Sequence, residues 1–262
     1  FHMMTPTSSD STRIVLKQRR PDVFIIVMES FSRLVMKTGA TPNLCRLADE
    51  GVMFENFYAN SFRTDRGLVA VLSGFPAQPS MSIMKYTGKA GRLPSIARSM
   101  INGGYKAATY YYGGDIDFCS QRAYLVSQGY TRLVSDKDFP LKYRMSKWGV
   151  PDGPLFDYVE RDINLSRSAG PALSVIQTSS SHEPFDVPVR LHRNKRLNAF
   201  AYTDMQIGRF IDWLKRSGRW KRSVVILVAD HLGAYPERID NLTLSRFQIP
   251  LIITGGAVDG HQ

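Results

Sequence analysis

Short runs of apolar residues alternate along this chain with stretches of helical periodicity. The clearest run, Val-Phe-Ile-Ile-Val-Met at residues 23–28, is continuously apolar and rich in β-branched residues, as in a strand buried on both faces. Further strand patterns occupy residues 52–58, 106–112, 173–178, 223–229 and 249–254, and helical patterns occupy residues 42–50, 64–72, 93–101, 154–163 and 197–216. This alternation predicts an α/β protein with a mainly parallel central sheet flanked by helices on both faces.

One domain accounts for the predicted elements. The chain has 262 residues, of which 43% are hydrophobic, enough for a sizeable core. The start, Phe-His-Met-Met, resembles a cloning remnant, so we expect residues 1–21 to be that remnant followed by a flexible basic leader. Residues 22–262 then form the folded domain, and Thr41 is expected to be the N-cap of its first helix. No run approaches the ~18 to 20 apolar residues that cross a membrane.

The charge and the cysteines narrow the class of protein. Lys and Arg number 34 against 23 Asp and Glu, a formal net charge of +11, which favours anionic partners: nucleic acid, phospholipid headgroups, or substrates that carry phosphate or sulfate. The basic residues of the leader suit either a membrane surface or plain exposure to solvent. With only Cys45 and Cys119, a disulfide scaffold is excluded, and we expect two free, mostly buried thiols.

Chemically active residues follow three of the predicted strands. Glu29 follows the first strand, His182 lies just after residues 173–178, and Asp230 and His231 follow residues 223–229. Ligands of such sheets gather at the carboxyl ends of the strands. An Asp-His pair there offers a carboxylate oxygen and an imidazole nitrogen to a divalent cation, although an isolated pair is also typical of a solvated turn. Glu29 alone is equally compatible with a partner for a helix N-terminus.

Thr64 opens a predicted helix within the sequence Ser-Phe-Arg-Thr-Asp-Arg-Gly. A hydroxyl at this position is usually an N-cap. The alternative is a nucleophile, activated by a metal and assisted by helix-terminal amides and a nearby guanidinium that hold the developing anion. Arg63 and Arg66 flank it, which suits a phosphoryl or sulfuryl group better than a carbonyl group.

In this order the motifs resemble a known family. Residues 41–61, TPNLCRLADEGVMFENFYANS, are similar to the sulfatase segment of the alkaline phosphatase superfamily. The sequences MESFSRL, FRTDRG, SSSHEPF and VADHLGAYPE narrow the resemblance to the lipoteichoic acid synthase-like phosphoglycerol transferases. The resemblance covers residues 22–256, and members of the family normally continue beyond that point with further sheet and helix. It therefore implies a sulfatase-like catalytic domain over residues 22–262 that lacks the family's C-terminal portion.

The resemblance implies a site for one divalent cation with four ligands: Glu29, Thr64, Asp230 and His231. The ion would be manganese, with magnesium or zinc as alternatives. Thr64 would be the nucleophile that takes the phosphoryl group covalently, and His182 would assist the transferred group or the leaving oxygen. Arg122 matches an arginine that holds the phosphate.

Two departures from the wider family bear on the substrate. Arylsulfatases need a Cys or Ser in a C/S-x-P-x-R motif, and this chain has Thr-Asp-Arg-Gly from Thr64 instead, so hydrolysis of sulfate esters is not expected. Residues 110–114 are tyrosines and glycines, where family members have aromatic and histidine residues ahead of the phosphate-binding arginine. This departure implies that the glycerol-phosphate pocket differs from that of the family. Trp148 is a candidate to line the substrate groove, with core packing as its alternative.

The resemblance thus implies an enzyme that moves a phosphoglycerol-type group from a phosphatidylglycerol-like lipid to a glycan or lipid acceptor. It would act as a monomer at the outer face of the cell membrane, held by an N-terminal anchor outside this chain, and would bind no nucleic acid. A phosphodiesterase or phosphatase and a phosphoethanolamine transferase could use the same site. A non-catalytic module that binds anionic polymers is a more distant alternative, which predicts strong salt dependence and no need for metal.

Overall fold

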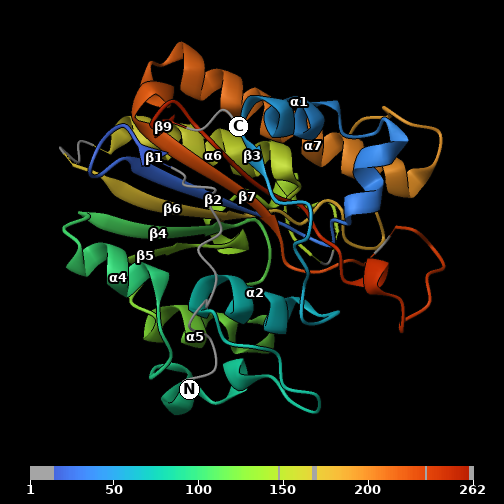
Figure 1. Cartoon of the computed structure of the whole chain (residues 1–262), viewed down its shortest axis with the longest axis horizontal. Helices are drawn as coiled ribbons and strands as arrows, with labels where there is room; N and C mark the ends of the chain where they lie inside the picture. Colours follow the sequence, from blue (N-terminus) through green and yellow to red (C-terminus); the bar gives the residue numbers. More distant parts are fainter. Residues whose placement is uncertain (1–14, 147, 167–169, 234, 260–262) are drawn as a thin grey trace.

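A seven-stranded sheet forms the centre of the computed structural model, which describes residues 15–146, 148–166, 170–233 and 235–259 (Figure 1). The strands, in spatial order, are β3 (Val52–Met53), β8 (Leu251–Thr254), β7 (Ser223–Ala229), β2 (Asp22–Met28), β6 (Ala172–Gln177), β4 (Ala107–Tyr112) and β5 (Arg132–Val134). The five from β7 to β5 run parallel, whereas β8 and β3 pair antiparallel with their neighbours. The predicted α/β class with a mainly parallel sheet is confirmed.

Helices cover both faces of this sheet (Figure 1). One layer contains α1 (Pro42–Glu50), α6 (Asp152–Leu165) and α7 (Lys195–Arg216), and the other contains α2 (Thr64–Ser73), α3 (Thr87–Ala90), α4 (Ile96–Asn102) and α5 (Gln121–Ser127). Successive side chains of a strand point to opposite faces, so β2 sends Phe24 into the first layer and Ile25 into the second. The uninterrupted apolar run of β2 is required because both of its faces are buried.

Smaller elements complete the described chain. A separate antiparallel pair joins β1 (Val15–Leu16) to β9 (Val258–Asp259), so part of the expected leader is a strand, while residues 1–14 lie outside the described residues. The 3-10 helices are η1 (Arg33–Thr38), η2 (Ile83–Lys85), η3 (Phe118–Ser120), η4 (Asp136–Asp138), η5 (Leu141–Tyr143), η6 (Arg219–Arg222) and η7 (Leu244–Arg246). Among the described helices, none combines the length and apolar character that a membrane span requires.

The expected strand at residues 52–58 is shorter than predicted. Regular pairing of β3 with β8 ends at Met53, although the Phe54 amide still donates to the Leu251 carbonyl at 3.0 Å. Pro250 precedes β8 and has no amide hydrogen, so it cannot extend the ladder. The chain beyond Met53 therefore follows the edge of the sheet through scattered hydrogen bonds.

The predicted cap of α1 is also different. Thr41 occupies the N-cap position, but its side chain makes no capping hydrogen bond. Instead the Asp204 carboxylate, from α7, accepts hydrogen bonds from the amides of Asn43 at 3.0 Å and Leu44 at 2.8 Å. A carboxylate at a helix N-terminus is favourable, and here it comes from a distant helix, which also fixes α1 against α7.

Candidate active site

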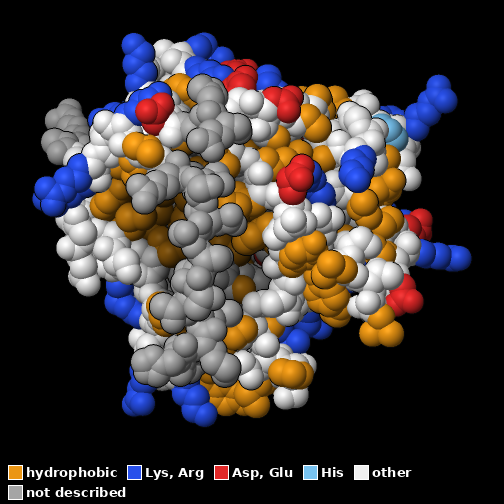
Figure 2. All heavy atoms as spheres, in the orientation of Figure 1, with side chains coloured by type: hydrophobic (Ala, Val, Ile, Leu, Met, Phe, Trp, Pro, Cys, Tyr) orange, Lys and Arg blue, Asp and Glu red, His pale blue; other side chains and the backbone are white. Residues whose placement is uncertain are grey.

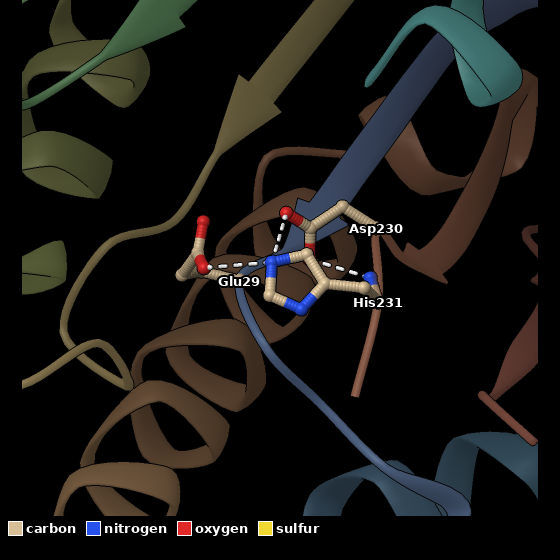
Figure 3. Close-up of side chains that lie close together, drawn as sticks. All are labelled: Glu29, Asp230 and His231. Atoms are coloured by element: carbon tan, nitrogen blue, oxygen red, sulfur yellow. Dashed lines mark hydrogen bonds and ion pairs between the residues drawn. The ribbon is translucent and has the colours of Figure 1, made fainter. Parts of the chain in front are cut away.

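Three of the predicted ligands meet at the carboxyl ends of two neighbouring strands. Glu29 follows β2, and Asp230 and His231 follow β7, which pairs directly with β2. One donor atom from each residue lies within 4.8 Å of the others (Figure 3). His231 Nε2 is 3.5 Å from a Glu29 carboxylate oxygen and 3.4 Å from Asp230 Oδ2. We call Glu29, Asp230 and His231 the acidic cluster.

Thr64 points into this cluster. It is the first residue of α2, whose N-cap is Arg63, so its hydroxyl does not serve as the cap. Thr64 Oγ1 lies 3.3 and 3.4 Å from the two carboxylate oxygens of Glu29 and 3.2 Å from His231 Nε2. The structure thus brings all four expected ligands together.

A glycine allows α2 to approach the cluster this closely. A Cβ atom on Gly67 would lie 2.4 Å from the carbonyl oxygen of Asp230, so only a residue without a side chain fits. Gly67 is one turn beyond Thr64 on the same face of the helix. This contact between helix and backbone therefore sets the position of the Thr64 hydroxyl.

Ser30 ties the two acidic strand ends together. Its amide donates to Asp230 Oδ1 at 3.0 Å, and its hydroxyl donates to a Glu29 carboxylate oxygen at 2.8 Å. Its backbone has the left-handed conformation, with φ 59°, which is unfavourable for a residue other than glycine. These two hydrogen bonds compensate for that conformation and hold the carboxylates side by side.

The charges of the cluster fit a divalent cation. Burial raises the pKa of Asp230 to about 7, and the nearby charge of Glu29 adds to the rise. Burial alone would lower the pKa of His231, but the carboxylates of Asp230 and Glu29 outweigh it and raise the pKa. Asp230 Oδ2 is buried and accepts no hydrogen bond from any residue that the structure describes. Two carboxylates and an imidazole with an acceptor left over are a suitable ligand set for such an ion.

Glu29 and His231 of the cluster, together with Thr64, line a pocket with a volume of about 300 Å³. His182 and Trp148 line the same pocket, and their rings are 4.3 Å apart. His182 Nδ1 lies 2.9 Å from the carbonyl oxygen of Glu183, which can only accept, so Nδ1 carries a hydrogen and Nε2 is available to a substrate. Trp148 thus lines this pocket, and its contact with a substrate stays a prediction.

The loop that carries His182 is held by a residue that sequence reasoning missed. Asp152 is fully buried, and its carboxylate accepts hydrogen bonds from the amides of Ser179 at 2.8 Å and Ser180 at 3.2 Å. The Thr203 hydroxyl donates to the same carboxylate at 2.5 Å. Nothing in the sequence near Asp152 indicates this role, because its partners lie 27 to 51 residues away.

The structure separates the three arginines that were predicted to hold phosphate. Arg63 lines the pocket. Arg66 lines a different, very small cavity on the side of α2 that faces Pro76. Arg122 is absent from the pocket lining and pairs with the Asp117 carboxylate, with its Nε 2.5 Å from Oδ1. Of these three arginines, only Arg63 therefore lines the pocket.

Two further pocket residues, Gln121 and Gln177, were not predicted. Gln177 is the last residue of β6, and Gln121 is the first residue of α5. The rule that ligands bind at strand ends could have indicated Gln177. The hydroxyl and histidine residues that follow at 179–182 satisfy the same rule, so the rule does not single out Gln177. Cys119 also lines the pocket, and both cysteines are free thiols as predicted, although only half-buried.

The chain is similar to known proteins over nearly its whole length. Phosphoglycerol transferase I from Xanthomonas campestris pv. campestris is 26% identical over 272 residues, which cover 94% of this chain and 38% of that protein. The chain therefore spans less than two fifths of the length of this curated relative. A solved protein of the alkaline phosphatase superfamily from Vibrio parahaemolyticus is 27% identical with a TM-score of 0.81, over 96% of this chain and 65% of that one.

A second solved structure, the lipoteichoic acid synthase LtaP from Listeria monocytogenes, superimposes with a TM-score of 0.77 and 21% identity, over 89% of this chain and 65% of that one. These similarities confirm the predicted resemblance to phosphoglycerol transferases and lipoteichoic acid synthases, and the predicted fold. The family model described as Sulfatase matches residues 21–259. Because that match extends over nearly the whole chain, the protein belongs to the sulfatase family, a family of enzymes.

Proposed function

We propose that residues 22–262 form the catalytic domain of a metal-dependent phosphoglycerol transferase. Its donor is a phosphatidylglycerol-like lipid and its acceptor is a glycan or a lipid. The observation that carries the proposal is the Thr64 hydroxyl, which lies within 3.4 Å of both Glu29 and His231 at the wall of a pocket. The names of similar proteins, phosphoglycerol transferase I and lipoteichoic acid synthase, support the choice of transferred group.

Glu29, Thr64, Asp230 and His231 are the residues that would hold the cation, which we propose to be manganese. When bound, it supplies Lewis acidity towards a phosphoryl oxygen and favours ionisation of the Thr64 hydroxyl. Asp230 Oδ2 supports this assignment, because it is buried and accepts no hydrogen bond from the described residues, so it is an acceptor that a cation could use.

The covalent chemistry is assigned to Thr64 and His182. Thr64 reacts as the alkoxide after its proton has passed to water: its oxygen forms a bond to phosphorus, and the bond from phosphorus to the diacylglycerol oxygen breaks. His182, protonated at Nε2, gives its proton to that leaving oxygen. The acceptor hydroxyl then returns a proton to His182 and attacks phosphorus, which releases the Thr64 alkoxide.

Two groups on α2 can hold the phosphoryl oxygens during both steps. The amides of the first turn of a helix have no partner within the helix, and the positive end of the helix dipole favours an anion there. Arg63 precedes this turn and lines the pocket, where its guanidinium can neutralise an equatorial oxygen.

A phosphodiesterase would differ from this activity only in the second step, whereas a phosphoethanolamine transferase would differ in the group transferred. If water replaces the acceptor, the protein is a phosphodiesterase that releases glycerol phosphate. On the face in Figure 2, Lys and Arg side chains lie mostly around the rim rather than in one patch, so this face gives no support to a non-catalytic module for anionic polymers. A lipid donor places the proposed domain at the outer face of the cell membrane.

Mass spectrometry of the protein incubated with phosphatidylglycerol vesicles and manganese tests the proposal. We expect a phosphoglycerol adduct on Thr64 and released diacylglycerol, and neither product with Thr64→Ala. Ser95→Ala is a matched control, since Ser95 truly caps a helix: its hydroxyl accepts from the Arg98 amide at 3.2 Å. It should lose about 1 kcal/mol of stability and keep its turnover. An adduct elsewhere, or turnover by Thr64→Ala, would refute the assignment.

A further inference from the structure

Two buried glutamine side chains form one wall of the pocket. Gln177 is 1% exposed and Gln121 is 6% exposed, yet both contribute to the pocket surface. Pairing in the sheet places Gln177 level with Val27 of β2 and with Tyr112 of β4. Glu29 lies only two residues beyond Val27, so this glutamine wall borders the acidic cluster.

A hydrogen-bond network fixes the two amides. Gln177 Oε1 accepts from the Tyr110 hydroxyl at 2.6 Å and from Gln121 Nε2 at 2.7 Å. Its two lone pairs are therefore used. Neither Gln177 Nε2 nor Gln121 Oε1 has a hydrogen bond to another residue in the part of the chain that the structure describes. The wall thus presents one NH2 donor and one carbonyl acceptor to whatever fills the pocket.

The two glutamines themselves carry no charge. Asp65 and Asp115 also line the pocket, but Asp65 Oδ1 already lies 3.7 Å from Arg63 Nε, and Asp115 is exposed with its Oδ1 accepting from the Asp117 amide at 2.9 Å. A cationic headgroup against the glutamines would therefore lose water without gaining a counter-charge from them. An ammonium also has donors only, so it cannot use the Gln177 NH2 group, whereas a hydroxyl both donates and accepts.

We propose that Gln121 and Gln177 select a neutral, hydroxylated headgroup of the glycerol class over a cationic one such as ethanolamine. This inference rests on the proposed function, because it assumes that the phosphoryl group lies at Thr64 and the acidic cluster. The headgroup then extends from the phosphorus towards β6 and α5, and its hydroxyls occupy the free donor and acceptor of the wall.

Binding measurements with Gln177→Glu test the inference. The glutamate keeps the size of the side chain and still accepts from Tyr110 and Gln121, but it lacks the free NH2 group and adds a negative charge. With manganese present, calorimetry should show that the wild type binds glycerol phosphate about tenfold more tightly than phosphoethanolamine. Gln177→Glu should reverse that order, and its affinity for inorganic phosphate should fall less than its affinity for glycerol phosphate, because only the latter also loses the NH2 donor.

Gln128→Glu is the matched control. Gln128 is equally buried and hydrogen-bonded to Ser73 and Ala90, but it does not line the pocket, so its variant should keep the wild-type preference. If Gln177→Glu does not fold, Gln121→Leu serves instead and should weaken glycerol phosphate alone. An unchanged preference in the folded variant, or equal weakening of all three ligands, would overturn the inference. Wild-type protein that binds glycerol phosphate selectively but forms no adduct on Thr64 would instead refute only the proposed function.

Discussion

Replacing Gly67 by alanine should separate the fold from catalysis. The new Cβ would lie 2.4 Å from the Asp230 carbonyl oxygen and 2.8 Å from its carbonyl carbon. A contact below about 3.0 Å is not tolerated, so α2 must move away from Asp230 by at least about 0.6 Å. Thr64 moves with it, and displacements of this order at a reacting atom can reduce turnover by about 100-fold.

Stability should change far less than activity. Overpacking costs about 1 to 3 kcal/mol, while alanine favours a helix over glycine by about 1 kcal/mol, so the two effects partly cancel. Diacylglycerol release from phosphatidylglycerol vesicles and the Tm measured on the same samples give the two readouts. Gly88→Ala in α3 is the control, because nothing lies within 4 Å of its added Cβ, and it should keep full turnover. Near wild-type turnover by a folded Gly67→Ala protein would show that this contact does not position Thr64.

The other predictions concern single side chains. Manganese should raise the Tm of the wild type, and chelation should reverse this rise. Asp230→Asn should lose most of the rise, whereas an equal rise in the variant and the wild type would place the ion elsewhere. His182→Ala should lower kcat by about 100-fold or more with manganese content unchanged, and loss of metal would make the histidine a ligand. Arg63→Ala should raise the KM for the lipid more than Arg122→Ala does, because Arg63 lines the pocket and Arg122 does not. The reverse order would mean that Arg122 leaves Asp117 to bind the substrate. Burial raises the pKa of Asp152, so the folded protein binds a proton there more tightly than the unfolded chain does. The stability of the wild type relative to Asp152→Asn, measured by urea unfolding, should therefore fall as the pH rises, and a constant difference would contradict this.

Local signals made the strands predictable, and with them the positions of Glu29, Asp230 and His231 at strand ends. The apolar run before Glu29 and the one before Asp230 each identify a buried strand and therefore a strand end. Neither run shows that the two strands are neighbours, which the resemblance to a known family supplied. The sequence also left Thr64 open between a helix cap and a nucleophile. Its position at the start of a helix is compatible with both, and only the direction of its hydroxyl distinguishes them.

Long-range partners explain what could not be predicted. The cap of α1 comes from Asp204, about 160 residues away, and no local pattern indicates it. Arg122 lies on α5, which was not predicted, and its pairing with Asp117 removes it from the pocket. Gln177 ends an apolar strand. The orientation of its side-chain amide is set by hydrogen bonds from a tyrosine of β4 and a glutamine of α5, which no local pattern indicates.

The pairing of β2 with β7 also has a consequence for how the molecule assembles. Ser30 and Asp230, which hold the strand ends together, are 200 residues apart in sequence. A growing chain that has not reached residue 231 has no complete acidic cluster, so a cation cannot guide the early stages of folding. It would bind once the ends of β2 and β7 lie side by side, and at 100 times its dissociation constant it would add about 2.7 kcal/mol to the stability of the folded domain. Cation binding would then report that these two strands are paired, and a protease or a truncation that removed β7 would abolish it.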